Sequence, residues 1–245
     1  MEILKKLYDF TWGKFIFAGA YDAFLKRAEE AGLSEERRKV VSQASGRTLE
    51  IATGTGLNFP HYPSAVTELV LSEFYPPMLE VLQRKVANSV HDISVVKADA
   101  ENLPFPDSSF DTVVATMILC STPKPSRVLQ EINRVLRPGG TYLFLEHIRN
   151  PDPKIAQFQD RIQPGWYLFG NGCHCNRDTI KTISQSPLVI DELNHGKIPK
   201  AWSILEYMIT GRAHKSEKSN DLAYSATELV GKASSSDCGC SSQCS

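Results

Sequence analysis

A glycine-rich turn stands directly after the first strand-like run of this sequence. Residues 48–52 read as a short buried strand, and Gly54 and Gly56 follow within four residues. Such a turn brings bare backbone against a ligand at the carboxyl edge of a parallel sheet. The acid that ends the next strand, Glu73, comes 23 residues after Glu50, where a carboxylate accepts hydrogen bonds from ribose hydroxyls. The sequence therefore predicts an α/β domain with an adenosine site.

Short strands alternate with helices through the middle of the chain. Besides the first strand, strands are predicted at 69–73, 93–98, 110–116 and 141–146, and helices at 78–86 and 127–136. This alternation is typical of a mostly parallel sheet with helices on both faces. Residues 138–140, Pro-Gly-Gly, predict a helix stop and a tight turn. Two later runs, 188–193 and 202–213, are joined by a loop alone, so we expect them to pair antiparallel.

The two ends of the chain differ from its middle. Residues 1–46 are predicted to form a helical cap, in which apolar side chains recur every three or four positions among residues 4–15. That first helix fits three roles: packing on its own domain, closing over a substrate site, or contacting a membrane surface. A second helical stretch, 25–41, has a break at 32–34. Residues 47–215 form the main domain, and 216–245, with nine serines, are predicted to be a disordered tail.

The residues around the turn limit which class of cofactor it can bind. A dinucleotide site uses a third glycine, where this chain has Phe59. The Gly-Lys-Ser/Thr of a phosphate-binding loop is also absent. An adenosine cofactor without a pyrophosphate, S-adenosyl-L-methionine (SAM), fits better. The formal net charge is −1, so the chain has no excess positive charge that would attract nucleic acid, and no nucleic-acid partner is expected.

Four motifs in order resemble the class I SAM-dependent methyltransferases, in the style of those that methylate ubiquinone and menaquinone. Besides the turn, they are Asp-Ala-Glu-Asn-Leu-Pro-Phe at 99–105, Phe-Asp at 110–111 and Arg-Pro-Gly-Gly at 137–140. A narrower resemblance, to the methyltransferase-like 7 family of alkyl thiol S-methyltransferases, adds Leu-Cys-Ser at 119–121, Leu-Glu-His at 145–147 and Gly-Cys-His-Cys-Asn-Arg at 172–177. The chain departs from the broader pattern at Ala52, where that family usually has glycine.

The resemblance implies a Rossmann-like class I methyltransferase fold: a mostly parallel seven-stranded sheet with helices on both faces and an antiparallel last strand. It implies SAM as the cofactor and S-methylation of a small thiol as the reaction. Methylation of arsenite or another soft metalloid, N- or C-methylation of a lipid or quinone-type acceptor, and a SAM-binding scaffold without turnover remain alternatives. The expected cofactor-binding residues are Glu50, Ala52, Thr53, Gly54, Gly56, Glu73, Phe74, Asp99, Ala100 and Met117.

The acceptor side is expected where strands four and five end. His147 is the candidate general base for a thiol acceptor, since a thiolate is the nucleophile; a role in tying the strand end to a neighbour is equally consistent. Cys120 fits a small buried hydrophobe or a ligand to a soft metalloid. The cysteine spacings do not match paired zinc motifs, so no metal site is predicted. The expected substrate-binding residues are Tyr8, Trp12, Cys120, Trp166, Cys173 and Cys175.

No apolar run is long enough for a membrane span, and no signal peptide is recognised. We therefore expect a cytoplasmic protein whose six cysteines stay reduced. Its expected partner is a small-molecule methyl acceptor. Peripheral membrane contact through residues 1–20 and the oligomeric state stay open.

Overall fold

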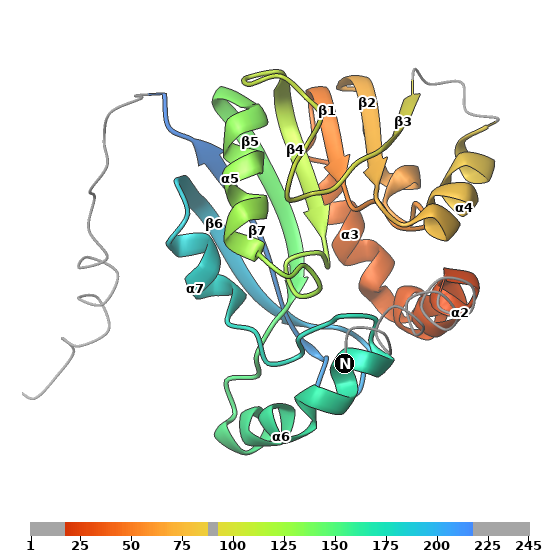
Figure 1. Cartoon of the computed structure of the whole chain (residues 1–245), viewed down its shortest axis with the longest axis vertical. Coiled ribbons are helices and arrows are strands. Elements are labelled where there is room, and N and C mark those ends of the chain that lie inside the picture. Colours follow the sequence, from red (N-terminus) through yellow and green to blue (C-terminus); the bar gives the residue numbers. More distant parts are fainter. Residues whose placement is uncertain (1–17, 88–92, 218–245) are drawn as a thin grey trace, which may run out of the picture.

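A seven-stranded sheet in the order β3-β2-β1-β4-β5-β7-β6 forms the centre of the molecule (Figure 1). The computed structural model describes residues 18–87 and 93–217. The strands are β1 (Gly46–Ile51), β2 (Val66–Glu73), β3 (Ile93–Lys97), β4 (Phe110–Thr116), β5 (Leu136–His147), β6 (Leu188–Lys197) and β7 (Tyr207–Lys215). β7 pairs antiparallel with β5 and β6, and all other pairs are parallel. The predicted fold class is confirmed.

Helices cover both faces of the sheet and part of its carboxyl edge. They are α2 (Ala18–Ala28), η2 (Glu29–Leu33), α3 (Ser34–Val41), η3 (Phe59–His61), α4 (Pro76–Val86), α5 (Pro125–Val135), α6 (Pro153–Phe169) and α7 (Thr179–Ser184). Helices α3 and α4 pack on one face, and α5 and α7 on the other. Helices α2 and α6 lie beyond the carboxyl ends of the parallel strands, at the lower edge in Figure 1.

Strand β4 shows why the central run lacks a polar alternation. Val113 and Val114 are both fully buried. Val113 belongs to the core that includes Ile132 of α5, and Val114 to the core that includes Val40 of α3. A parallel strand covered on both faces requires apolar side chains at successive positions. The burial of both valines therefore follows from the helices that cover the two faces of the sheet.

The predicted start of the last strand is wrong. The strand expected at 202–213 begins only at Tyr207. Its first apolar residues serve another purpose, because Trp202 makes an edge contact with Trp166 of α6 and Ile204 is buried in the cluster around that tryptophan. Apolar periodicity alone cannot distinguish such packing from a strand.

A bulge replaces the tight turn that was predicted at residues 138–140. The register of β5 on β4 shifts between Phe110 and Thr112, so residues 138–140 bulge within β5, which begins at Leu136. Gly139 has a φ of +73°, which glycine adopts without steric cost. The glycine is required as expected, but strand pairing continues on both sides of it.

The predicted helical stretch at 25–41 is confirmed, with Gly32 (φ +129°) at its break. No helix in residues 18–87 and 93–217 is both long and apolar enough to cross a bilayer. The amphipathic pattern of residues 4–15 lies outside the described residues, and so does the tail from residue 218 onward.

Candidate active site

The turn after β1 leaves backbone uncovered at the carboxyl edge of the sheet. Gly54 and Gly56 have φ values of +63° and +83°, which residues with a Cβ rarely adopt. A Cβ on Gly56 would lie 2.9 Å from Leu82 Cδ1 of α4. Glycine at this position therefore allows α4 to pack closely against the turn, and the turn forms a cradle that a side chain would fill.

Ala52, just before these glycines, has a φ of +50°. This left-handed conformation costs a residue with a Cβ about 1–2 kcal/mol. Ala52→Gly is therefore expected to raise the free energy of unfolding by about 0.5–1 kcal/mol, since the freedom of glycine in the unfolded chain offsets part of the gain. Urea denaturation measures the change. Ala156→Gly within α6 is the control and should lower stability by about 0.5–1 kcal/mol; a loss in both variants would contradict strain at Ala52.

Glu73 ends β2 beside the glycine-rich turn. Its Oε2 accepts a hydrogen bond from the Gly54 N–H (2.7 Å) and its Oε1 accepts one from the Tyr75 N–H (2.7 Å). Burial raises the pKa of this carboxyl. Each oxygen keeps lone-pair capacity for a further donor. The carboxylate is thus fixed where the hydroxyls of a nucleoside above the turn would meet it.

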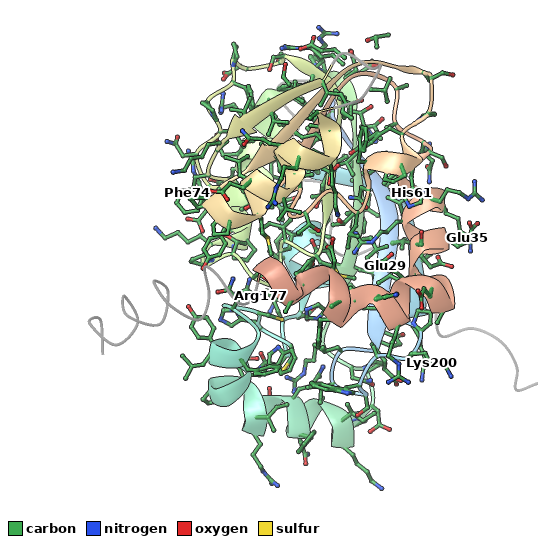
Figure 2. The ribbon with its side chains drawn as sticks, turned by 90° about the vertical axis from the view of Figure 1, so that its right-hand side faces the viewer. Glu29, Glu35, His61, Phe74, Arg177 and Lys200 are labelled. Carbon is green, nitrogen blue, oxygen red and sulfur yellow. The ribbon has the colours of Figure 1, made fainter. Side chains whose placement is uncertain are left out.

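The end of β3 adds a second acid and lies next to an exposed aromatic ring. Asp99 is exposed, and its Oδ1 accepts a hydrogen bond from the Glu101 N–H (2.9 Å). Phe74 is 57% exposed, with Lys97 Nζ 6.0 Å from its ring centroid; Figure 2 shows the ring at the surface. Ala100 packs against the main core. Together with Glu73 and the turn, these groups suit the adenosine part of SAM.

Glu50 and Thr53 lie beneath the turn. Glu50 Oε1 accepts from Asn58 Nδ2 (3.0 Å) and its Oε2 from Tyr62 Oη (2.6 Å), and burial raises the pKa of Glu50 to about 7. Thr53 Oγ1 donates to the Glu50 carbonyl oxygen. The geometry gives both residues a supporting position under the turn, and their predicted cofactor contacts stay predictions.

A second group of side chains gathers where β4 and β5 end. Cys120 follows β4, His147 ends β5, and Cys173 lies in the loop after α6; they are 2%, 6% and 8% exposed. His147 Nε2 lies 3.1 Å from Cys173 Sγ, and one ligand atom from each residue lies within 4.8 Å of the other two. We call Cys120, His147 and Cys173 the Cys–His–Cys cluster. Its members are 27 and 26 positions apart in the sequence.

The members of this cluster perturb one another. The hydrogen bond from Cys173 and the neighbouring His147 hold the pKa of Cys120 well below its usual value, against the effect of burial. Burial opposes a charge on His147, but the adjacent Cys120 raises the pKa of the imidazole. The Nδ1 atom of His147 is buried and has no hydrogen-bond partner among the described residues. Cys120 is thus the thiol of this cluster that ionises most readily.

Two charged residues that the sequence did not identify as site residues hold the loop after β4. The Glu146 Oε1 atom accepts hydrogen bonds from the backbone N–H groups of Ile118 (3.0 Å) and Leu119 (2.9 Å). The guanidinium of Arg177 donates to the carbonyl oxygens of Leu119 and Thr122. Both residues stand inside the motifs at 145–147 and 172–177, so these motifs could have identified them as site residues. They fix the backbone that carries Cys120.

Glu146→Ala is expected to lower the free energy of unfolding by about 2–3 kcal/mol, because one buried and one partly buried N–H group lose their acceptor. Glu146→Gln keeps an acceptor oxygen of the same shape, so the expected loss is below about 1 kcal/mol. Chemical denaturation of both variants measures the difference. Equal losses in the two variants would contradict the anchoring role of the Oε1 atom.

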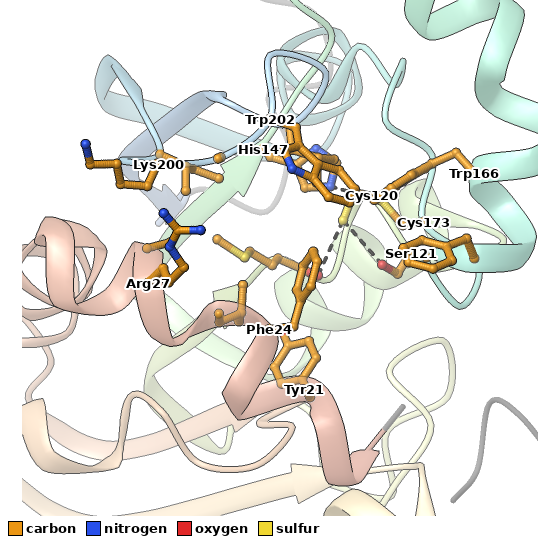
Figure 3. Close-up of a pocket in the computed structure, with 18 of the residues that line it drawn as sticks. Tyr21, Phe24, Arg27, Cys120, Ser121, His147, Trp166, Cys173, Lys200 and Trp202 are labelled. Atoms are coloured by element: carbon orange, nitrogen blue, oxygen red, sulfur yellow. Dashed lines mark hydrogen bonds between the residues drawn. The ribbon is translucent and has the colours of Figure 1, made fainter. Parts of the chain in front are cut away.

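A cavity of about 430 Å³ opens beside the Cys–His–Cys cluster. Figure 3 shows Tyr21 and Phe24 of α2 facing the cluster across it. Trp166 and Trp202 also line the pocket, and their rings are in edge contact with each other. The remaining lining residues are Ala20, Leu25, Arg27, Ala28, Met117, Ser121, Phe169, Gly170, Ile198, Lys200, Ala201 and Leu205. The pocket is therefore largely apolar, and its sulfur and imidazole groups are concentrated at one end.

Helix α2 contacts both the pocket and the turn. Its Asp22 accepts hydrogen bonds from Thr55 Oγ1 in the turn and from Lys85 Nζ of α4 (2.8 Å). The next residue but one, Phe24, lines the pocket. Burial raises the pKa of Tyr21 in the same helix to about 12. One short helix thus joins the two halves of the site.

Among the predicted substrate residues, Cys120, Trp166 and Cys173 line this pocket, and so do His147 and Met117. Cys175 does not. Its thiol is fully buried and donates to Gln163 Oε1 (3.3 Å), so the structure does not bring Cys175 to this pocket. Tyr8 and Trp12 lie outside the described residues. Tyr21, Phe24 and Trp202 were not predicted, because a lone aromatic residue in a helix or loop gives no sign of which cavity it faces.

Comparisons with known proteins agree with this geometry. Residues 49–144 match the family model described as "Methyltransferase domain". The chain is 35% identical to the thiol S-methyltransferase TMT1B of Rattus norvegicus, over 68% of this chain and 70% of that protein. It is 31% identical to a phosphatidylethanolamine N-methyltransferase of Cereibacter sphaeroides, over 66% and 75% of the two chains. A solved SAM-dependent methyltransferase from Thermotoga maritima shares the fold, with a TM-score of 0.60, 21% identity and coverage of 84% and 100%.

Proposed function

Because this chain belongs to the methyltransferase-like 7 family of SAM-dependent methyltransferases, its cofactor is SAM, and we propose that it methylates the sulfur of a small, apolar thiol. The observation that carries the proposal is the pocket itself. Its aromatic walls lead to Cys120, His147 and Cys173, where an acceptor thiol would lie next to an imidazole. Bound SAM supplies a methyl group that is already activated on a sulfonium sulfur, so the protein has to position the acceptor, exclude water and manage one proton.

We assign the cofactor to the carboxyl edge between β1 and β3. Glu73 would accept the ribose hydroxyls, Asp99 and Ala100 would meet the adenine edge, and Gly54 and Gly56 would leave room for the methionine portion. The buried carboxylate next to a turn without side chains supports this assignment. Met117 lines the pocket at the end of β4, next in the sheet to β1, and would separate the cofactor from the acceptor.

The charges around the pocket favour a thiol over an amine. Among the described lining residues the charged side chains are Arg27 and Lys200, and none is acidic. A pocket whose charged side chains are both cationic disfavours a protonated amine acceptor. Figure 3 shows both cations away from the cysteines, so they would attract a polar group carried by the far end of the acceptor. A lipid amine, the substrate type named for one relative, is therefore the weaker candidate.

Transfer of isotope from methyl-labelled SAM tests the proposal. The panel contains an alkyl thiol, hydrogen sulfide, arsenite with glutathione, and phosphatidylethanolamine vesicles. We expect labelled thioether from the alkyl thiol, with little label in the vesicles. Label in arsenite alone or in the lipid alone would overturn the thiol assignment while leaving the methyltransferase in place.

The variant Phe24→Lys, which puts a charge on the pocket wall, should raise the KM for the alkyl thiol more than for hydrogen sulfide.

A further inference from the structure

The Cys–His–Cys cluster brings three potential metal-ligand atoms close together, two sulfurs and one imidazole nitrogen. The ligand atoms lie within 4.8 Å of one another, and two of them, His147 Nε2 and Cys173 Sγ, are 3.1 Å apart. All three side chains are buried yet line the pocket. A small ion that enters the pocket would therefore meet two thiols and an imidazole at its inner end.

We propose that Cys120, His147 and Cys173 bind a zinc ion whose fourth coordination position faces the pocket. Zinc takes cysteine and histidine ligands in tetrahedral geometry, and a site with three protein ligands and one open position is the arrangement of catalytic zinc. Two thiolates balance the charge of the divalent ion inside a buried site. Trivalent arsenic favours three sulfur ligands, so the imidazole makes zinc the better match.

The geometry requires only a small adjustment. Bond lengths of about 2.3 Å to sulfur and 2.0 Å to nitrogen place tetrahedral ligand atoms about 3.5–3.8 Å apart. Since no two ligand atoms of the cluster are more than 4.8 Å apart, each separation has to contract by at most about 1 Å, which rotation of a cysteine side chain about χ1 can supply. The ligands come from elements held firmly in place: Glu146 and Arg177 fix the backbone that carries Cys120, and the Gln163 side chain donates to the Cys173 carbonyl oxygen (3.2 Å).

This inference rests on the proposed thiol methylation, and it makes His147 a metal ligand in place of the general base expected from the sequence. The acceptor thiol would bind the ion as a thiolate, and its proton would pass to solvent. A sulfur lone pair then forms the bond to the methyl carbon, while the electron pair of the broken sulfonium S–C bond stays on the sulfur of S-adenosylhomocysteine. The neutral thioether is a poorer ligand than a thiolate, so it leaves the ion.

Direct metal binding tests the site without relying on activity. The full chain is prepared with Cys238, Cys240 and Cys244 changed to serine, so that the tail thiols do not bind metal. It is stripped with a chelator and titrated with Zn²⁺, and in parallel with Co²⁺ as a spectroscopic probe. We expect one ion per chain, a thiolate-to-cobalt charge-transfer band, and a change in that band when an alkyl thiol is added.

Single variants in the same background locate the ion. Cys120→Ser and Cys173→Ser are expected to weaken Zn²⁺ binding at least about 100-fold. Cys175→Ser is the matched control, because this cysteine is two positions from Cys173 but its thiol faces α6; its Zn²⁺ affinity should stay unchanged. Circular dichroism checks that each variant is folded.

The outcomes separate the two proposals. Thiol methylation by a protein that binds no zinc and gives no charge-transfer band would overturn the metal site and leave the proposed function standing. Zinc binding that persists in Cys120→Ser and Cys173→Ser would likewise overturn the site. Zinc bound through the cluster, with no methyl transfer to any thiol, would support the site and overturn thiol methylation.

Discussion

Replacing Glu73 by alanine is expected to weaken SAM binding about 10–100-fold. A buried hydrogen bond to a charged group contributes about 1.5–3 kcal/mol, and about 1.4 kcal/mol corresponds to a factor of ten in Kd. Glu73 also holds the Gly54 N–H, so its removal would release the turn as well as the ribose hydroxyls. Isothermal titration with SAM measures the change in Kd.

Glu68→Ala is the control for this measurement. Glu68 lies on the same strand, β2, but its carboxylate pairs with Arg47 (2.7 Å) near the surface and away from the turn. The Kd for SAM should stay within about twofold in this variant, since an exposed ion pair contributes little. An unchanged Kd in Glu73→Ala, with a folded protein, would overturn the placement of the ribose at the end of β2.

His147→Ala is expected to lower kcat for an alkyl thiol about 100-fold or more. A positioned general base contributes about 10²–10⁴-fold, and the loss of a metal ligand would be at least as damaging. Since His147 lines the acceptor pocket and not the glycine-rich turn, the Kd for SAM should remain within about twofold. Steady-state kinetics and SAM titration on the same preparation measure both quantities.

His195→Ala serves as the matched histidine control, because His195 is exposed on β6 and contacts Tyr207. Its kcat should equal that of the unaltered protein. A decrease in SAM affinity that parallels the decrease in kcat of His147→Ala would show that the substitution disturbs the fold. Unaltered kcat would exclude both a base and a ligand role for His147.

The glycine-rich turn and the strand-end acid beside it were largely predictable from the sequence, since each is a short and contiguous motif. A strand followed at once by Gly54 and Gly56 encodes its own turn, and Glu73 follows at the spacing of one strand–loop–strand repeat. Glu50 shows the limit of this reasoning. It belongs to the same motif, but its carboxylate is engaged by Asn58 and Tyr62 below the turn, and only three-dimensional packing decides which way a strand-end side chain turns.

On the proposed acceptor side, the individual residues could be predicted from the sequence, but their clustering in space could not. Cys120, His147 and Cys173 were each expected near the acceptor, but the expectation of no metal site relied on cysteines close together in the sequence. Their approach depends on the pairing of β4 with β5 and on the path of the chain after α6, which are long-range contacts. Trp202 likewise gave the pattern of a strand, although it packs on Trp166 beside the pocket.

Helix α2 physically links the glycine-rich turn to the pocket. Because Asp22 hydrogen-bonds the glycine-rich turn and Phe24 lines the pocket, a ligand that immobilises the helix at one of these places also immobilises it at the other. A cofactor that fixes α2 would leave a preorganised wall for the acceptor, and thermodynamic linkage requires the acceptor to tighten the cofactor by the same factor. Coupling of this kind is a heterotropic cooperativity that acts equally in both directions.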